Sequence, residues 1–197
     1  AEKYYYNKNE CKNERTKDVA SLGADVLDKY SVATSDEAVQ DQSGTTGECT
    51  WSYDASTKTL TVSGNGDMGS YDDWEAPAPW HDFRDNINKV VIENGVTSIG
   101  SYSFFYCEGI TQITIPDSVI SIGFEAFSGC TSLADITIPN SVLSIGEGAF
   151  QGCSNLRNIH IPNSVTSIGG DAFYNTADYN NQPNGVVYID AWAVGYK

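Results

Sequence analysis

The stretch Val96-Thr97-Ser98-Ile99-Gly100 decides the fold, because close copies of it begin at Val119, Val142 and Val165, each 23 residues after the last. Other residue types recur with the same spacing of 23 residues. Phenylalanine recurs at positions 104, 127, 150 and 173, cysteine at 107, 130 and 153, and an Ile-Pro pair at 115, 138 and 161. A close repeat with a period in the twenties is typical of a solenoid, in which each unit packs against its neighbours. The pattern therefore predicts a repeat solenoid of the α/β class with 23-residue units.

Each unit is expected to contain two extended segments. Residues 113–115, 136–138 and 159–161 read Ile-x-Ile, which places two isoleucines on the inner face of a strand before proline ends it. Stacked units would pair these strands into a parallel sheet. The Val-x-Ser-Ile-Gly copies supply the second, shorter segment, and we expect their serines to hydrogen-bond in each turn. A helical turn between the segments would press the phenylalanine into the interior.

The array is predicted to begin at residue 87, because Ile87, Val90 and Ile92 each stand 23 residues before an isoleucine of the next unit, at positions 110, 113 and 115. Upstream, apolar and polar side chains alternate at 49–53 and 60–62 on either side of a short polar turn, which indicates a β-hairpin. An uncovered terminal unit would expose apolar surface and unpaired strand edges. We therefore interpret residues 44–86 as an N-terminal cap, with Trp51 and Trp80 in its own core.

The two ends of the chain carry weaker signals. Residues 1–43 are polar and mixed in charge; a helix is expected at about 14–30, and residues 31–44 are typical of a linker. Tyr4-Tyr5-Tyr6 is either a binding tract or a weakly ordered tail. The solenoid, residues 87–197, ends in an atypical unit after Phe173, with a possible hairpin strand at 191–196 and no evident cap. We expect a chain cut from something longer.

The pattern that carries a family resemblance is clearest in the fourth unit. After Gly152-Cys153, residues 156–173 read Leu-x-x-Ile-x-Ile-Pro-x-Ser-Val-x-Ser-Ile-Gly-x-x-Ala-Phe, which resembles the BspA-like (treponemal-type) leucine-rich repeat. The resemblance covers residues 87–173, and residues 44–86 resemble the N-terminal region of such proteins from gut and oral bacteria. It implies a right-handed, curved leucine-rich-repeat solenoid with a parallel β-sheet on the concave face, preceded by a β-hairpin cap. It also implies a secreted or surface-attached bacterial protein; members are described as adhesins, but no family motif fixes a ligand.

The net charge of the chain limits the kinds of molecule that it can bind. Its 26 acidic and 11 basic residues leave a net charge of −15, which argues against nucleic acids and anionic membrane surfaces. No apolar run is long enough to span a bilayer, and the first residues lack the layout of a signal peptide. The five cysteines are an odd number, which argues against a dense disulfide framework.

The cysteines offer little chemistry. Cys107, Cys130 and Cys153 belong to the repeat and have no histidine at ligand spacing, so buried structural thiols are favoured over a metal or redox ladder. Cys11 and Cys49 lie outside the repeat, and a disulfide between them is left open for an extracellular protein.

Candidate catalytic and metal-binding residues are equally sparse. His81-Asp82 is the one cluster that could perform acid–base chemistry, but it lacks a nucleophile and oxyanion donors, so capping and solvation are favoured. Asp67, Asp72, Asp73 and Glu75 could collect a calcium ion, although their spacing differs from an EF-hand loop. We expect no enzyme, no cofactor and no metal site.

What remains is a polar, nearly neutral strip of outward-facing residues on the strand layer, called here the strand strip, which suits hydrogen-bonded contacts with protein or glycan. Its members are Lys89, Val91, Thr111, Gln112, Thr114, Asp135, Thr137, Arg157, Asn158 and His160.

We therefore predict a noncatalytic, extracellular binding module, secreted or attached to the bacterial cell surface. It would be a monomer that mediates adhesion or protein–protein or glycan recognition, and its partner would be a host or bacterial surface or matrix protein or glycan. Nucleic acid and membrane insertion are not expected. The alternative is a structural spacer or display stalk within a longer surface protein.

Overall fold

The computed structural model describes residues 39–72 and 75–197. The chain separates into two units, 1–38 and 39–197, and the account below concerns the second. The expected helix at 14–30, the tyrosine tract at 4–6 and Cys11 lie outside the described residues.

The described unit begins with three antiparallel strands, β1 (Gln42–Thr46), β2 (Cys49–Asp54) and β3 (Thr59–Gly64). Side chains of β2 alternate between buried and exposed, with Cys49, Trp51 and Tyr53 inside, so the predicted hairpin is confirmed. Strand β1 lies partly within the expected linker. Its sequence is polar and only Thr46 is buried, so the alternation of apolar and polar residues that predicts a strand is absent from β1.

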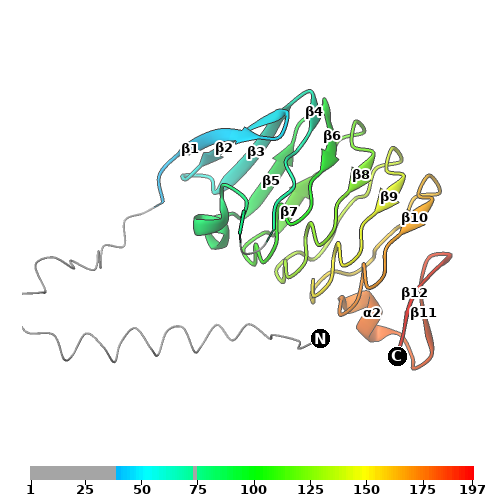
Figure 1. Cartoon of the computed structure of the whole chain (residues 1–197). Helices are drawn as coiled ribbons and strands as arrows, with labels where there is room; N and C mark the ends of the chain where they lie inside the picture. The colour runs from blue at the N-terminus through cyan, green and yellow to red at the C-terminus, as the bar shows by residue number, and fades with distance from the viewer. Residues whose placement is uncertain (1–38, 73–74) are drawn as a thin grey trace, which may run out of the picture. The chain divides into compact units, whose positions relative to one another are not determined.

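The first sheet has the strand order β1-β2-β3-β5-β7. Strand β5 (Lys89–Ile92) pairs in parallel with β3 on one side and with β7 (Gln112–Thr114) on the other, where Lys89 faces Gln112. The cap thus continues the sheet of the first repeats (Figure 1). Strand β5 lies in the unit that was predicted to begin at residue 87, and it holds the Val90 and Ile92 on which that prediction rested.

The strand layer predicted for the later units is wrong, because β7 is the last strand of this sheet and residues 136–138 and 159–161 are not in strands. Each Ile-x-Ile segment is only three residues long and runs into a proline, which has no N–H to donate; residues 113–115 share this sequence, and of them only Ile113 and Thr114 lie in β7. Such short segments have few backbone groups with which to extend a ladder. Their isoleucines are nevertheless buried, as expected for the inner face.

The sheet that crosses every unit is the second one, formed by the Val-x-Ser-Ile-Gly copies. It has the order β10-β9-β8-β6-β4, with β4 (Gly66–Asp67), β6 (Val96–Ile99), β8 (Ser121–Ile122), β9 (Ser144–Ile145) and β10 (Ser167–Ile168). All its pairs are parallel. Figure 1 shows β6, β8, β9 and β10 side by side in chain order. Serine faces serine along this ladder, in the series Ser98, Ser121, Ser144, Ser167.

A ladder of stacked aromatic rings fills the interior. Trp80 stacks on Phe104 at a centroid distance of 5.6 Å, and the next three steps, which run from Phe104 to Phe173, measure 5.1, 5.3 and 5.5 Å. All five rings are fully buried. Trp80 also donates its indole N–H to the Ser103 carbonyl at 2.7 Å, and it meets Trp51 edge-on at 5.7 Å. Trp51 and Trp80 are buried, as predicted, but they belong to one core that continues into the repeats and not to a separate core of their own.

Hydroxyl groups tie neighbouring units together, and the regular ones belong to another serine of the repeat than the Val-x-Ser-Ile-Gly serines on which the prediction rested; of those, Ser98 bonds to Asp67. The serine that precedes each valine instead donates to the carbonyl of the preceding unit's valine. These bonds run from Ser118 to Val96, from Ser141 to Val119 and from Ser164 to Val142, at 2.7, 2.6 and 2.9 Å. The serines in the strands contribute their backbone to the ladder.

After Phe173 the fourth unit continues into a short helix and a hairpin, so the hairpin expected at residues 191–196 is confirmed. Thr176 stands at the cysteine position, where its buried hydroxyl accepts from the Tyr179 N–H and begins α2 (Ala177–Asn181). The hairpin of β11 (Val186–Ile189) and β12 (Trp192–Tyr196) follows. Asp178 and Asp190 accept the backbone N–H groups of Ile159 and Ile161 at 2.8 and 2.6 Å. Two carboxylates thus satisfy donors of the last Ile-x-Ile segment.

Candidate binding surface

The structure leaves nearly all of the strand strip accessible to a partner. Every member is exposed except Val91, which is half-buried. Lys89 and Val91 lie on β5, Gln112 and Thr114 lie on β7, and Thr111 directly precedes β7. The other five members follow in the third and fourth units, outside regular strands: Asp135, Thr137, Arg157, Asn158 and His160.

Backbone bonds between units hold parts of this surface in place. The Thr111 hydroxyl and N–H both reach the Asn88 carbonyl, at 3.2 and 2.9 Å, while the Asn88 amide donates to the Gly109 carbonyl at 3.0 Å. One unit further on, the Arg157 N–H donates to the Ala134 carbonyl at 3.0 Å. The strip therefore stands on ordered backbone, which reduces the entropy lost when a partner binds.

His160 connects the strip to the C-terminal hairpin. Its Nδ1 lies 3.0 Å from the Asp190 carboxylate, which also accepts the Ile161 N–H. The His160 side chain is 79% exposed, so this pair orients the imidazole more than it stabilises the fold. Asp190 was not predicted as a partner of His160, because it follows β11, outside the regular part of the repeat. It has a positive φ of 49° in a two-residue turn, a position at which aspartate is favoured.

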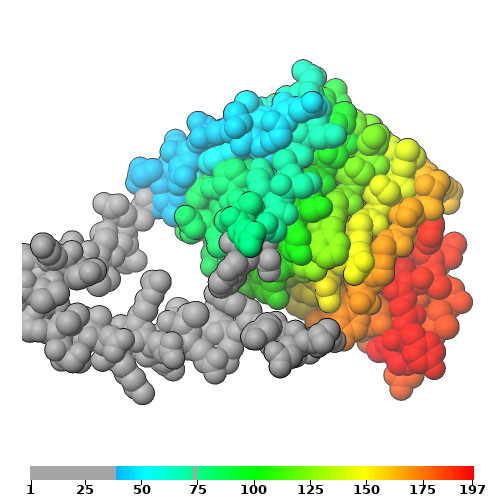
Figure 2. All heavy atoms as spheres, in the orientation of Figure 1, coloured from blue at the N-terminus to red at the C-terminus, as the bar shows by residue number. Residues whose placement is uncertain are grey.

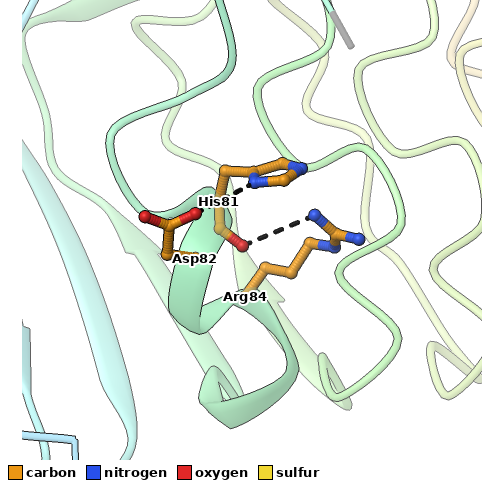
Figure 3. A network of polar contacts seen from close by, with 3 residues as sticks. All are labelled: His81, Asp82 and Arg84. Atoms are coloured by element: carbon orange, nitrogen blue, oxygen red, sulfur yellow. Dashed lines mark hydrogen bonds and ion pairs between the residues drawn. The ribbon is translucent and has the colours of Figure 1, made fainter. Parts of the chain in front are cut away.

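The His81-Asp82 cluster is a local contact at the start of the 3₁₀-helix η2 (His81–Asn86). Figure 3 shows His81, Asp82 and Arg84 on this one short element. The imidazole Nδ1 is 3.4 Å from the Asp82 carboxylate, and Arg84 donates to the His81 carbonyl at 3.5 Å. The group is thus built from residues close in sequence on one short element.

Asp67 and Asp72, two of the acidic residues considered for calcium, accept hydrogen bonds from neighbouring residues instead. Asp67 accepts the Thr97 hydroxyl at 2.6 Å, and this bond, together with that from Ser98, lowers the pKa of the Asp67 carboxyl. Asp72 accepts the N–H groups of Glu75 and Ala76, as in a turn. Asp73 lies outside the described residues. Within the described ranges, no three histidine, cysteine, aspartate or glutamate residues gather as a metal site would need.

The repeat cysteines are buried, as predicted. Cys130 and Cys153 donate weakly to the carbonyls of Phe104 and Phe127, at 3.2 and 3.1 Å. Burial raises the pKa of the Cys107 and Cys130 thiols well above the usual range, which keeps them neutral and unreactive near pH 7. Cys49 is a free, buried thiol whose pKa is raised by burial and by the Glu48 and Asp67 carboxylates. Its hypothetical disulfide partner, Cys11, lies outside the described residues.

Among the described residues, no helix has both the length and the apolar character needed to cross a bilayer.

Parallel strands that pair unit by unit over a ladder of buried phenylalanines define a leucine-rich-repeat protein. A family model described as BspA type Leucine rich repeat region matches residues 82–193 with six copies. The chain belongs to this family. The matched range includes η2 and reaches into β12, so it is wider than the resemblance seen at residues 87–173. A search of curated proteins finds no match.

Solved bacterial leucine-rich-repeat structures resemble the chain. One from Eubacterium ventriosum is 27% identical with a TM-score of 0.55, and the match covers 70% of this chain and 42% of that one. One from Bacteroides ovatus is 30% identical with a TM-score of 0.46, over 64% of this chain and 37% of that one. One from Treponema pallidum is 25% identical with a TM-score of 0.47, over 66% and 67%. The chain thus spans less than half of the Eubacterium protein.

Proposed function

We propose that this chain is a noncatalytic binding module whose repeats form a right-handed, curved solenoid of 23-residue units, with residues 44–86 as its N-terminal cap. The observation that carries the proposal is membership of the BspA-type family, together with an accessible strip of polar side chains on ordered backbone. Repeat proteins of this kind use extended surfaces, not enclosed pockets, to bind macromolecules.

The chemistry of the strip favours a protein or glycan partner. Lys89 and Arg157 offer positive charge, Asp135 offers negative charge, and the threonines, Gln112 and Asn158 offer donors and acceptors. A mixed polar surface of this kind gives specificity through hydrogen bonds and contains no dominant basic patch for nucleic acid. We place the protein outside the cell, at the bacterial surface, where adhesion to matrix proteins or mucin glycans would use this surface.

The test is capture of host matrix and mucin fractions by the immobilised full chain, followed by the triple variant Gln112→Ala, Arg157→Ala, His160→Ala. All three side chains are exposed, so their removal should leave the fold intact, as circular dichroism would verify. A partner that is captured by the parent chain and lost by the variant supports the proposal. Capture of nothing favours the alternative function, a structural spacer in a longer surface protein.

A further inference from the structure

A second surface feature is independent of the strand strip. An open groove of about 360 Å³ crosses the turns that follow the buried phenylalanines, and it shares no lining residue with the strip. Tyr106 and Tyr174 lie at its two ends, Gly129 and Gly152 lie between them, and Glu125 and Gln151 contribute polar groups. Its volume lies within the range of small-molecule binding sites.

The groove exists because the two middle units have no side chain at one repeat position. Tyr106, Gly129, Gly152 and Asn175 are successive copies of this position, and all four have positive φ, of 51°, 75°, 72° and 60°. Since tyrosine and asparagine adopt this backbone in the outer units, glycine is not needed for the turn itself. A Cβ on Gly152 would have no heavy atom nearer than 3.7 Å, so a side chain there would project into open space. Gly152 therefore leaves the hollow open, whereas a Cβ on Gly129 would meet the Tyr106 ring at 3.0 Å.

Both tyrosines are exposed on one side and supported on the other. Tyr106 is 45% exposed; its ring packs over Gly129 and meets Phe105 edge-on at 4.6 Å. Tyr174 is 46% exposed and meets the buried Tyr179 edge-on at 5.3 Å. The Tyr179 hydroxyl in turn donates to the Tyr196 carbonyl at 3.1 Å. Rings held in this way lose little conformational entropy when a ligand stacks on them.

The backbone of the groove is already used by the repeat ladder, which disfavours an extended peptide. The N–H groups of Tyr106, Gly129 and Gly152 donate to backbone carbonyls of the next unit, those of Ser128, Gln151 and Tyr174, at 2.8, 2.7 and 2.9 Å. A peptide that adds as a strand needs free backbone groups of this kind. Recognition in the groove must therefore come from rings and side chains.

Exposed aromatic rings beside amide and carboxylate groups suit a carbohydrate. The C–H face of a pyranose carries slight positive charge and packs on the negative face of an aromatic ring. Its hydroxyl groups both donate and accept hydrogen bonds, as do the amides of Gln151 and Asn175. The Asn175 amide is oriented by Asn180, which donates to its oxygen at 2.8 Å. Glu125 and the net charge of −15 disfavour anionic sugars.

We propose that the groove between Tyr106 and Tyr174 binds a short neutral oligosaccharide, with the sugar rings over Gly152 and against the two tyrosines.

The experiment uses the full chain and three neutral probes, cellotetraose, maltotetraose and triacetylchitotriose, with binding measured by isothermal titration calorimetry. At least one probe should bind. Tyr174→Ala should weaken that binding at least tenfold, and Gly152→Asn should abolish it by filling the floor with the residue that stands at position 175. Asparagine tolerates positive φ, so this variant should fold normally.

Tyr188→Ala is the matched control, because Tyr188 is a similarly exposed tyrosine (52%) on β11 that does not line the groove. It should bind the probe as the parent does, and so should the triple variant of the strand strip. Binding that survives Gly152→Asn in a folded protein would overturn the proposal. So would the absence of binding to all three probes, or competition for the groove by a random peptide library. None of these results would bear on the strand strip.

Discussion

Phe127 shows how a single residue maintains the array. It is fully buried, with its ring between those of Phe104 and Phe150 at 5.1 and 5.3 Å. Phe127→Ala removes the ring and leaves a cavity in a dry core, so we expect the free energy of unfolding to fall by about 3–5 kcal/mol. Urea unfolding followed by circular dichroism measures this. The exposed control Tyr188→Ala should change it by no more than about 0.5 kcal/mol, and equal losses in the two variants would contradict the ladder.

Asp190 is predicted to act through its acceptor oxygen more than through its charge. Asp190→Asn keeps an oxygen for the Ile161 N–H and removes only the carboxylate charge that faces the exposed His160, so stability should change little. Asp190→Ala leaves that N–H without its partner and should cost about 1–3 kcal/mol. Thermal unfolding of the two variants at pH 7 separates the effects. A loss in Asp190→Asn as large as that in Asp190→Ala would show that the charge matters instead.

The buried thiols predict a dependence of stability on pH. Burial raises the pKa of Cys130, whereas the same thiol in the unfolded chain ionises near about 8.5. Above that pH the unfolded chain releases a proton that the folded chain keeps, so stability should be constant below about 8.5 and fall as the pH rises further. Urea midpoints from pH 7 to pH 10 test this. Cys130→Ala should show a shallower fall, and an unchanged slope would refute the assignment.

At the scale of elements, the cap and the repeats should unfold together because Trp80 belongs to both. Trp80→Phe keeps a ring on Phe104 but removes the donor to the Ser103 carbonyl, and should cost about 1–3 kcal/mol. Trp80→Ala should cost more, since it also removes the last ring of the ladder. Hydrogen exchange of the β5 and β6 amides measures whether the loss spreads into the first repeats. Faster exchange confined to β1–β3 would contradict a shared core.

Some helices and strands of this chain could be predicted from patterns in the sequence, and others could not. Apolar alternation predicted β2 and β3, and the 23-residue step predicted the pairing partner of every repeat strand. Strand β1 escaped prediction because it pairs through backbone while its side chains face solvent. The Ile-x-Ile segments were assigned to strands by their pattern, but a pattern of buried side chains does not determine whether neighbouring backbones come close enough to pair. The hydrogen bonds from Ile159 and Ile161 to Asp178 and Asp190 were not predicted, because these two aspartates do not repeat.

At the scale of the whole molecule, the described unit presents successive repeats as parallel bands, as Figure 2 shows by colour. Its surface therefore varies mainly in the residues that differ between units. The strand strip could be listed from the sequence, since exposure follows from the Ile-x-Ile alternation. The groove could not, because it depends on glycine in two adjacent units and on tyrosines that the fold, not the chain, brings to either side.

The central claim is that the chain is a binding module that acts through the strand strip. The most direct measurement is biolayer interferometry of the full chain against immobilised matrix proteins and mucin, with the Gln112, Arg157 and His160 triple alanine variant measured beside it. The account predicts saturable binding to at least one of these partners, weakened at least tenfold in the variant. The absence of binding to all of them, or equal binding by parent and variant, would contradict it.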